Sequence, residues 1–332
     1  MNYNLILVTV ETPKLQLKSL QTVSCDAWRN ERFTDTLELC VSVSGYEARC
    51  TDWSRKTIPA SFRTFAVLGF TEMRDSLSRP ASDRFYYDRG CDVVNFSRDD
   101  STGVLMSIQK AIQLAQTPET RLHVHIDYSC MPRNWYCNLP LFLERILRKD
   151  DMAYFWYTAG NYPTGEYPTA GASDFRVFAG RASLSAKFRT HVFGLGFDRI
   201  RANAICSVLD PQYLICFYAN PGVKDEYVRK VEIDNADILR QANLTFTAPL
   251  NDFNAAFTRL CSIANEFKEL GDVVFVPDGP KPLVLASSLV PLAIQTTGTV
   301  CFHVSRRKMQ DKQPVDVVAT GECYGFSFAG IV

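Results

Sequence analysis

The chain has 332 residues, and its 36 lysines and arginines are balanced by 36 aspartates and glutamates. Hydrophobic residues make up 46% of it and charged residues 22%, as in ordinary soluble globular proteins. A net charge of zero argues against a protein dedicated to the backbone of duplex nucleic acid, which would usually carry a basic excess. At roughly 150 residues per domain, this length predicts about two domains.

Three features of the chain bear on its compartment. Eleven cysteines are scattered with no CxxC pair and no zinc-type spacing, which predicts free, reduced thiols. The first residues lack the basic and apolar regions of a signal peptide. The longest apolar stretch, 283–294, is shorter than a bilayer-spanning helix. We therefore expect a cytoplasmic protein with no membrane partner.

In chain order, two halves of the sequence repeat one pattern. An apolar run meets a glycine, and a later apolar run meets an aspartate 82 residues further on. The landmarks are Gly45 and Asp127 in the first half and Gly196 and Asp278 in the second. Since strand-like runs between the landmarks also match, the pattern predicts an internal duplication.

An amphipathic helix with i, i+3, i+4, i+7 spacing is predicted over 104–115 in the first half and over 253–267 in the second. Alternation of such helices with short apolar strands predicts an α/β fold, with a mostly parallel sheet covered by helices on both faces. We therefore predict two tandem Rossmann-like lobes related by internal duplication.

The predicted boundaries follow from composition. Residues 1–160 form the first lobe, with an extra N-terminal strand over 5–10. Residues 161–187, rich in Gly, Pro, Ala and Ser, form a linker or an exposed excursion. Residues 188–332 form the second lobe, which ends in a hairpin.

Ligands of an open parallel sheet bind beyond the carboxyl ends of the strands, where the strand order reverses. The loops predicted to meet there contain glycines, which admit a close approach, and cations, which attract an anion. Each loop also opens a helix, whose free N–H groups favour negative charge. The predicted ligand-binding residues are Gly45, Arg49, Ser129 and Arg133 in the first lobe, and Gly194, Gly196, Arg201, Gly279 and Lys281 in the second.

Candidates for acid–base chemistry are Asp127, Glu47 and Asp278, although acids in such loops are more typical of helix caps and arginine partners. His123 and His125 alternate on one face of a strand and would bind a metal if a carboxylate lay nearby. Core histidines are the more common outcome on a buried strand. We therefore predict no metal site and no cofactor.

A strand that runs into Gly279, Pro280 and Lys281, followed by a helix over 283–289, is similar to the glycine-threonine-lysine loop of CARF domains. Two such units in one chain resemble the SAVED arrangement. The resemblance implies Rossmann-like domains that sense cyclic oligonucleotides in prokaryotic antiviral systems. Pro280 stands where that family has threonine, and the first lobe has 127–133 in place of the triplet.

We therefore expect a sensor or effector that binds a nucleotide or another phosphorylated small molecule, with a protein partner from the same defence system as an option. One alternative is a hydrolase that processes nucleotides or nucleosides through Asp127, Glu47 or Asp278. A further alternative is a non-catalytic scaffold subunit of a defence complex. Turnover separates the first two, because a sensor leaves its ligand intact.

Overall fold

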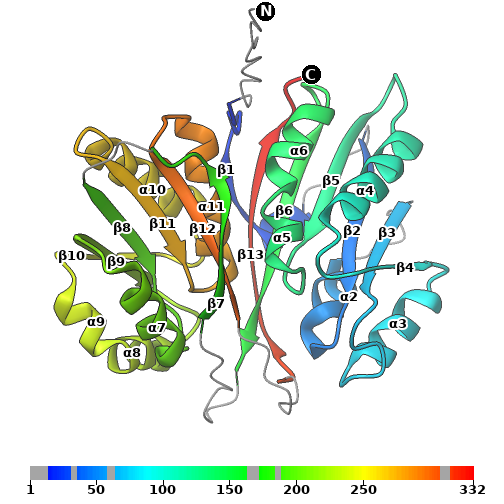
Figure 1. The fold of residues 1–332 in the computed structure, drawn as a ribbon. Helices are drawn as coiled ribbons and strands as arrows, with labels where there is room; N and C mark the ends of the chain where they lie inside the picture. The colour runs from blue at the N-terminus through cyan, green and yellow to red at the C-terminus, as the bar shows by residue number, and fades with distance from the viewer. Residues whose placement is uncertain (1–13, 31–35, 58–63, 163–171, 184–187, 307–314) are drawn as a thin grey trace, which may run out of the picture.

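A computed structural model describes residues 14–30, 36–57, 64–162, 172–183, 188–306 and 315–332. It contains two mixed sheets that lie side by side, each with helices on both faces (Figure 1). The predicted α/β class and the two Rossmann-like lobes are confirmed. None of the described helices combines the length and the apolar character needed to cross a bilayer.

The first sheet has a parallel centre and an antiparallel border. Its seven strands follow the order β1 (Gln21–Ser24), β13 (Val318–Ala329), β6 (Met152–Asn161), β5 (Arg121–Asp127), β2 (Thr36–Ser44), β3 (Thr64–Phe70) and β4 (Val93–Phe96). Strands β6 to β4 are parallel, whereas β13 runs antiparallel to both of its neighbours.

The second sheet repeats this plan with one strand fewer. Its six strands follow the order β10 (Leu244–Ala248), β9 (Tyr213–Ala219), β8 (Arg189–Gly194), β11 (Asp272–Pro277), β12 (Thr299–Arg306) and β7 (Ala172–Gly180). Only β7 is antiparallel to its neighbour.

Helices cover both faces of each sheet. One face of the first sheet packs against α1 (Cys25–Asn30), α2 (Asp52–Thr57) and α3 (Arg79–Tyr87), and the other against α4 (Ser101–Ala115), α5 (Arg133–Tyr136) and α6 (Leu139–Ile146). One face of the second sheet packs against α7 (Arg199–Leu209), α8 (Asp225–Asp234) and α9 (Ala236–Gln241), and the other against α10 (Phe253–Phe267) and α11 (Lys281–Ile294). A short 3-10 helix, η1 (Ala48–Thr51), precedes α2.

The internal duplication is visible in the strand order. The series β6-β5-β2-β3-β4 matches β12-β11-β8-β9-β10, and an antiparallel strand borders each series. Asp127 and Asp278 each directly follow the last residue that pairs with the neighbouring β2 or β8, so they occupy equivalent positions. Counted from the partners of those last residues, Gly45 lies four residues further along the chain but Gly196 only two. The two glycines therefore lie at different distances along the chain from the carboxyl ends of the paired strands.

The passages between the lobes differ from the predicted boundaries. Residues 172–180, predicted as part of a linker, form β7 of the second sheet. Residues 318–329, predicted in a hairpin on the second lobe, form the single strand β13, which pairs with β6 of the first sheet. Each lobe's last parallel strand therefore leads into the antiparallel strand of the other sheet. The strand predicted over 5–10 lies outside the described residues.

One apolar core joins the lobes. It contains the inward face of α4 and α6 from the first lobe and of α10 and α11 from the second, together with β13. Phe253 of α10 stacks on Phe326 of β13 with ring centroids 3.8 Å apart. Because this core is continuous, the two lobes form one packed unit.

Candidate functional site

Seven charged side chains predicted to belong to the site form two interacting sets where the lobes meet. Glu47, Arg49, Asp127 and Lys281 make up one set, and Arg133, Arg201 and Asp278 make up the other; together we call them the interlobe cluster. Each member lies at or just beyond the carboxyl end of a parallel strand, or in the first turn of the helix that follows. The predicted convergence of these loops is therefore seen for both lobes.

Lys281, in the first turn of α11, reaches from the second lobe to the first. Its ammonium donates to the carbonyl oxygens of Ser129 at 2.6 Å and Met131 at 2.8 Å, and lies 3.5 Å from that of Tyr128. Burial lowers the pKa of Lys281 to about 8. The ammonium therefore lies in a poorly solvated position between the lobes.

Arg133 makes the opposite crossing, from the first lobe to the second. Its guanidinium donates to the carbonyl oxygen of Pro277 at 3.1 Å and to Asp278 Oδ1 at 3.4 Å. Arg201 Nε donates to the same Oδ1 at 2.8 Å. One carboxylate therefore serves two guanidinium groups on the side of the second lobe.

Arg49 is buried within the first lobe. Its Nε donates to Glu47 Oε2 at 2.6 Å, and its Nη1 donates to the carbonyl oxygen of Thr158 at 3.0 Å. Burial alone would lower the pKa of Arg49, but the charge of Glu47 raises it well above its usual value. Arg49 is therefore a permanent cation paired with Glu47.

Asp127 and Ser129 form a local turn at the end of β5. The backbone N–H and the hydroxyl of Ser129 both donate to Asp127 Oδ1, at 3.0 and 2.5 Å. The hydroxyl oxygen also accepts from the backbone N–H of Thr158 on β6 at 2.7 Å. Burial raises the pKa of Asp127 to about 6 in spite of the bonds from Ser129. Asp127 therefore titrates closer to neutrality than an exposed aspartate does.

The predicted glycines permit close packing of loops. A Cβ atom at Gly196 would lie 2.4 Å from the carbonyl oxygen of Asp278, and one at Gly279 would lie 2.8 Å from that of Leu195. At Gly45 it would lie 2.6 Å from Cys50 Sγ, and at Gly194 it would lie 2.9 Å from the ring of Phe217. Gly196 and Gly279 therefore let the loops after β8 and β11 pack closely, and all four glycines face protein atoms.

Two buried hydroxyls border the cluster without a hydrogen-bond partner among the described residues. They are Thr158 Oγ1, on the residue whose carbonyl holds Arg49, and the hydroxyl of Tyr136, whose ring centroid lies 5.7 Å from Lys281 Nζ. Buried polar groups are rarely left unsatisfied unless water or a ligand completes them. Two cavities of about 370 and 470 Å³ lie elsewhere, beside β1 and β13 and beside β4 and α4.

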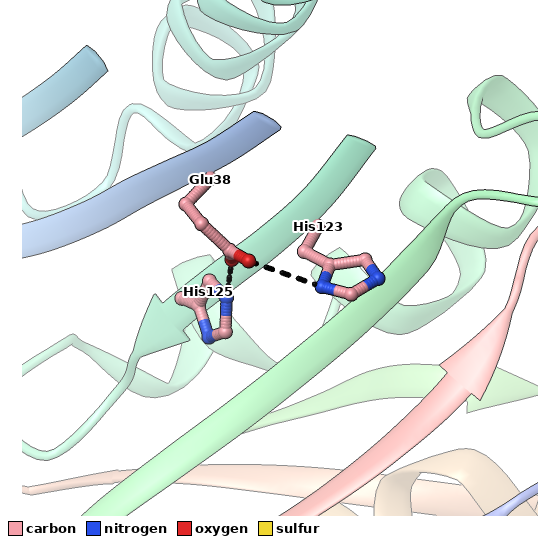
Figure 2. Close-up of side chains that lie close together, drawn as sticks. All are labelled: Glu38, His123 and His125. Atoms are coloured by element: carbon pink, nitrogen blue, oxygen red, sulfur yellow. Dashed lines mark hydrogen bonds and ion pairs between the residues drawn. The ribbon is translucent and has the colours of Figure 1, made fainter. Parts of the chain in front are cut away.

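A second group of titratable side chains lies on the α1–α2 face of the first sheet. Figure 2 shows Glu38 of β2 between His123 and His125 of β5. Glu38 Oε2 lies 2.5 Å from His125 Nε2, and Oε1 lies 3.3 Å from His123 Nδ1. The histidines were predicted, but Glu38 was not, because the chain gives no sign of which carboxylate faces them.

The hydrogen bonds of His125 decide whether this triad fits a metal ion. Trp156 Nε1, which can only donate, lies 3.0 Å from His125 Nδ1. The proton of the neutral ring is therefore on Nε2, where it is donated to Glu38. A metal needs an unprotonated nitrogen, so the triad as arranged does not fit one. Burial alone would raise the pKa of Glu38, but the bonds from both histidines lower it to about 2.

The duplicated lobe shows that the fold does not require this polar face. By strand register, the positions of His123 and His125 correspond to Val274 and Val276 on β11. Both valines belong to the apolar cluster under α7 and α8. The hydrogen-bonded chain from Trp156 through His125 to Glu38 is therefore a feature of the first lobe alone.

Comparison with known proteins gives no family for the chain. No protein-family model matches it, and no curated protein matches it. Among solved structures, it is similar to the crystal structure of the cytoplasmic domain of a prokaryotic cation chloride cotransporter. That match has 10% identity and a TM-score of 0.22, and covers 82% of this chain and 96% of the other. A likeness at this level carries no argument about function.

Proposed function

We propose that the chain binds a small phosphorylated ligand, such as a nucleotide, between its lobes and acts as a sensor of that ligand. The observation that carries the proposal is the surroundings of Lys281. Within the described residues, its hydrogen-bond partners are three neutral carbonyl oxygens and include no carboxylate. A phosphate oxygen in place of one of them would form a charge-assisted hydrogen bond, which is stronger than a bond to a neutral acceptor.

The hydrogen bonds of the interlobe cluster support an anionic ligand at Lys281. Among the described residues, its carboxylates accept from Arg49, Arg133, Arg201 and Ser129, and none of them accepts from Lys281. Buried cations need compensation, because transfer of a charge out of water is unfavourable unless it is paired. An anion would also supply acceptors for the unsatisfied hydroxyls of Thr158 and Tyr136.

The two half-sites are not equivalent in this proposal. In the second lobe, Asp278 Oδ1 already accepts from both Arg133 and Arg201, so these cations have a carboxylate partner. Lys281, which reaches the loops of the first lobe, hydrogen-bonds only neutral carbonyl oxygens within the described part of the chain. We therefore place one composite site at the loops of the first lobe, with Lys281 contributed by the second.

Asp127 supports the hydrolase alternative. General acid–base groups work best with a pKa near the working pH, and burial raises the pKa of this carboxyl to about 6. Incubation of the purified protein with its bound ligand, followed by mass spectrometry of the ligand, separates the two functions. An intact ligand supports a sensor and a cleaved ligand supports a hydrolase.

The proposal includes a cytoplasmic location, which is supported by the eleven cysteines, all free thiols in the structure. Native mass spectrometry of freshly purified protein should reveal a co-purified phosphorylated compound. Titration calorimetry with that compound should then show binding that Lys281→Ala weakens roughly 10-fold or more. Lys110→Ala, which removes an exposed lysine on α4, is the matched control and should bind normally. Equal affinity of the two variants would contradict the site.

A further inference from the structure

Glu47 is an unusual neighbour for a phosphate site. Its side chain is 17% exposed, and its Oε2 lies 3.7 Å from Sγ of Cys130, the residue between the two, Ser129 and Met131, whose carbonyl oxygens accept from Lys281. A bare phosphate ion at Lys281 would therefore be repelled by an acid beside it. The ligand therefore needs, beside its phosphate, a group that a carboxylate attracts, such as a hydrogen-bond donor.

The two oxygens of Glu47 are used differently. Oε2 accepts from Arg49 Nε at 2.6 Å and lies 3.7 Å from Cys130 Sγ. Oε1 accepts no hydrogen bond from any of the described residues. Since Oε2 already accepts from the guanidinium of Arg49, a second cation at Oε1 would be repelled by that group, and Oε1 suits a neutral donor better. A hydroxyl group is such a donor.

We propose that the ligand is a phosphate ester of a polyol, the sugar phosphates of nucleotides included. Its phosphate lies on Lys281, and a nearby hydroxyl donates to Glu47 Oε1. This inference rests on the proposed function, because it requires the phosphate to bind at Lys281. It assigns Glu47 to recognition of the ligand's hydroxyl, as the residue that separates such esters from inorganic phosphate and from simple alkyl phosphates.

Two small phosphate esters of equal charge and length test the inference on the full chain. sn-Glycerol 3-phosphate carries hydroxyls and n-propyl phosphate carries none, and neither has a carbonyl that would react with a lysine. Titrations followed by ligand-observed NMR should show that the glycerol ester binds at least about 10-fold more tightly, since a hydrogen bond to a charged acceptor is worth roughly that factor. Inorganic phosphate should bind more weakly than the glycerol ester.

Variants of Glu47 then assign the preference. Glu47→Met removes the acceptor and should bring the two esters to equal affinity, whereas Glu47→Gln keeps a carbonyl oxygen and should retain part of the difference. Thermal melting shows whether each variant is folded. The comparison of the two esters on the wild-type protein does not depend on the variants. Equal binding of both esters to the wild type, or a preference that persists in folded Glu47→Met, would overturn the inference and leave the proposed function. Binding of neither ester would overturn the proposed function itself.

Discussion

Lys281 and Arg133 occupy corresponding places in the two lobes, and each donates hydrogen bonds to the lobe opposite. Each directly follows a proline that precedes a helix, with Pro132 at ψ 152° and Pro280 at ψ 151°. Lys281 binds carbonyl oxygens of the β5–α5 loop, and Arg133 binds the end of β11 and the acid after it. The duplication therefore places one cation from each lobe across the interface.

Replacement of Lys281 by methionine should change how stability depends on pH. The pKa of Lys281 is about 8 in the folded protein and 10.5 in an exposed lysine. Between these values the unfolded chain binds the extra proton, so the stability contributed by Lys281 rises with pH and is lost as pH falls toward 8. Over this pH range, the free energy of unfolding of the wild type should rise by up to about 3 kcal/mol relative to that of Lys281→Met. Urea unfolding of both proteins at several pH values measures it, and a constant difference would contradict it.

Asp127→Asn should show the opposite trend at lower pH. The pKa of Asp127 is about 6 when folded and 3.8 when exposed. Between those values the folded state binds the extra proton. The stability that Asp127 contributes is therefore fully present below pH 3.8 and is lost as the pH rises through 6. Across this pH range, the free energy of unfolding of the wild type should fall by up to about 3 kcal/mol relative to that of Asp127→Asn. Chemical unfolding at matched ionic strength measures the difference, and parallel profiles would show that Asp127 titrates normally.

His125 should be a neutral imidazole that carries its proton on Nε2. Trp156 donates to Nδ1, and burial lowers the pKa of His125 although Glu38 opposes that shift. Long-range proton–nitrogen correlation NMR identifies the tautomer directly. Zinc should not bind at this triad, so zinc titrations of wild type and His125→Ala should agree. An Nδ1–H tautomer, or zinc binding that His125→Ala abolishes, would contradict the prediction.

Loss of β13 should unfold the first lobe before the second. A chain that ends at residue 316 lacks the partner of β1 and β6 as well as the rings of Phe326 and Phe328, which are buried in the shared core. Strands β7 to β12 of the second sheet all remain. Hydrogen exchange should therefore show lost protection in β5 and β6 and retained protection in β8 and β9. Equal protection in both sheets would contradict this prediction.

The fold class follows from the sequence because central parallel strands are buried on both faces and appear as apolar runs. Strand β7 was missed for the converse reason: most of its residues are exposed or half-buried, and it lies at a sheet border. The pairing of β13 with β6 has no local signal, because the two strands are separated by the entire second lobe. Short-range patterns therefore predict the repeats but not their connection.

The sequence predicted which loops meet, but only some of the contacts that their residues make. The position of charged residues after strands placed Lys281, Arg133 and Asp127 in loops that do meet. That Lys281 and Arg133 bind the opposite lobe follows from how two lobes pack, which no motif encodes. Glu38 was missed because its partner His123 is 85 residues away, and strand register alone brings the two together.

The position of β13 sets an order in which the protein can be completed on the ribosome. Domains near the N-terminus generally fold first during synthesis. Here the first sheet lacks β13 until residues 318–329 have been translated, whereas the strands of the second sheet are complete at residue 306. The first lobe is thus completed after the second, and the nascent protein carries an unpaired edge on β6 while the second lobe is made. A chaperone, or a strand of another chain, would therefore bind the nascent protein at this exposed edge of β6.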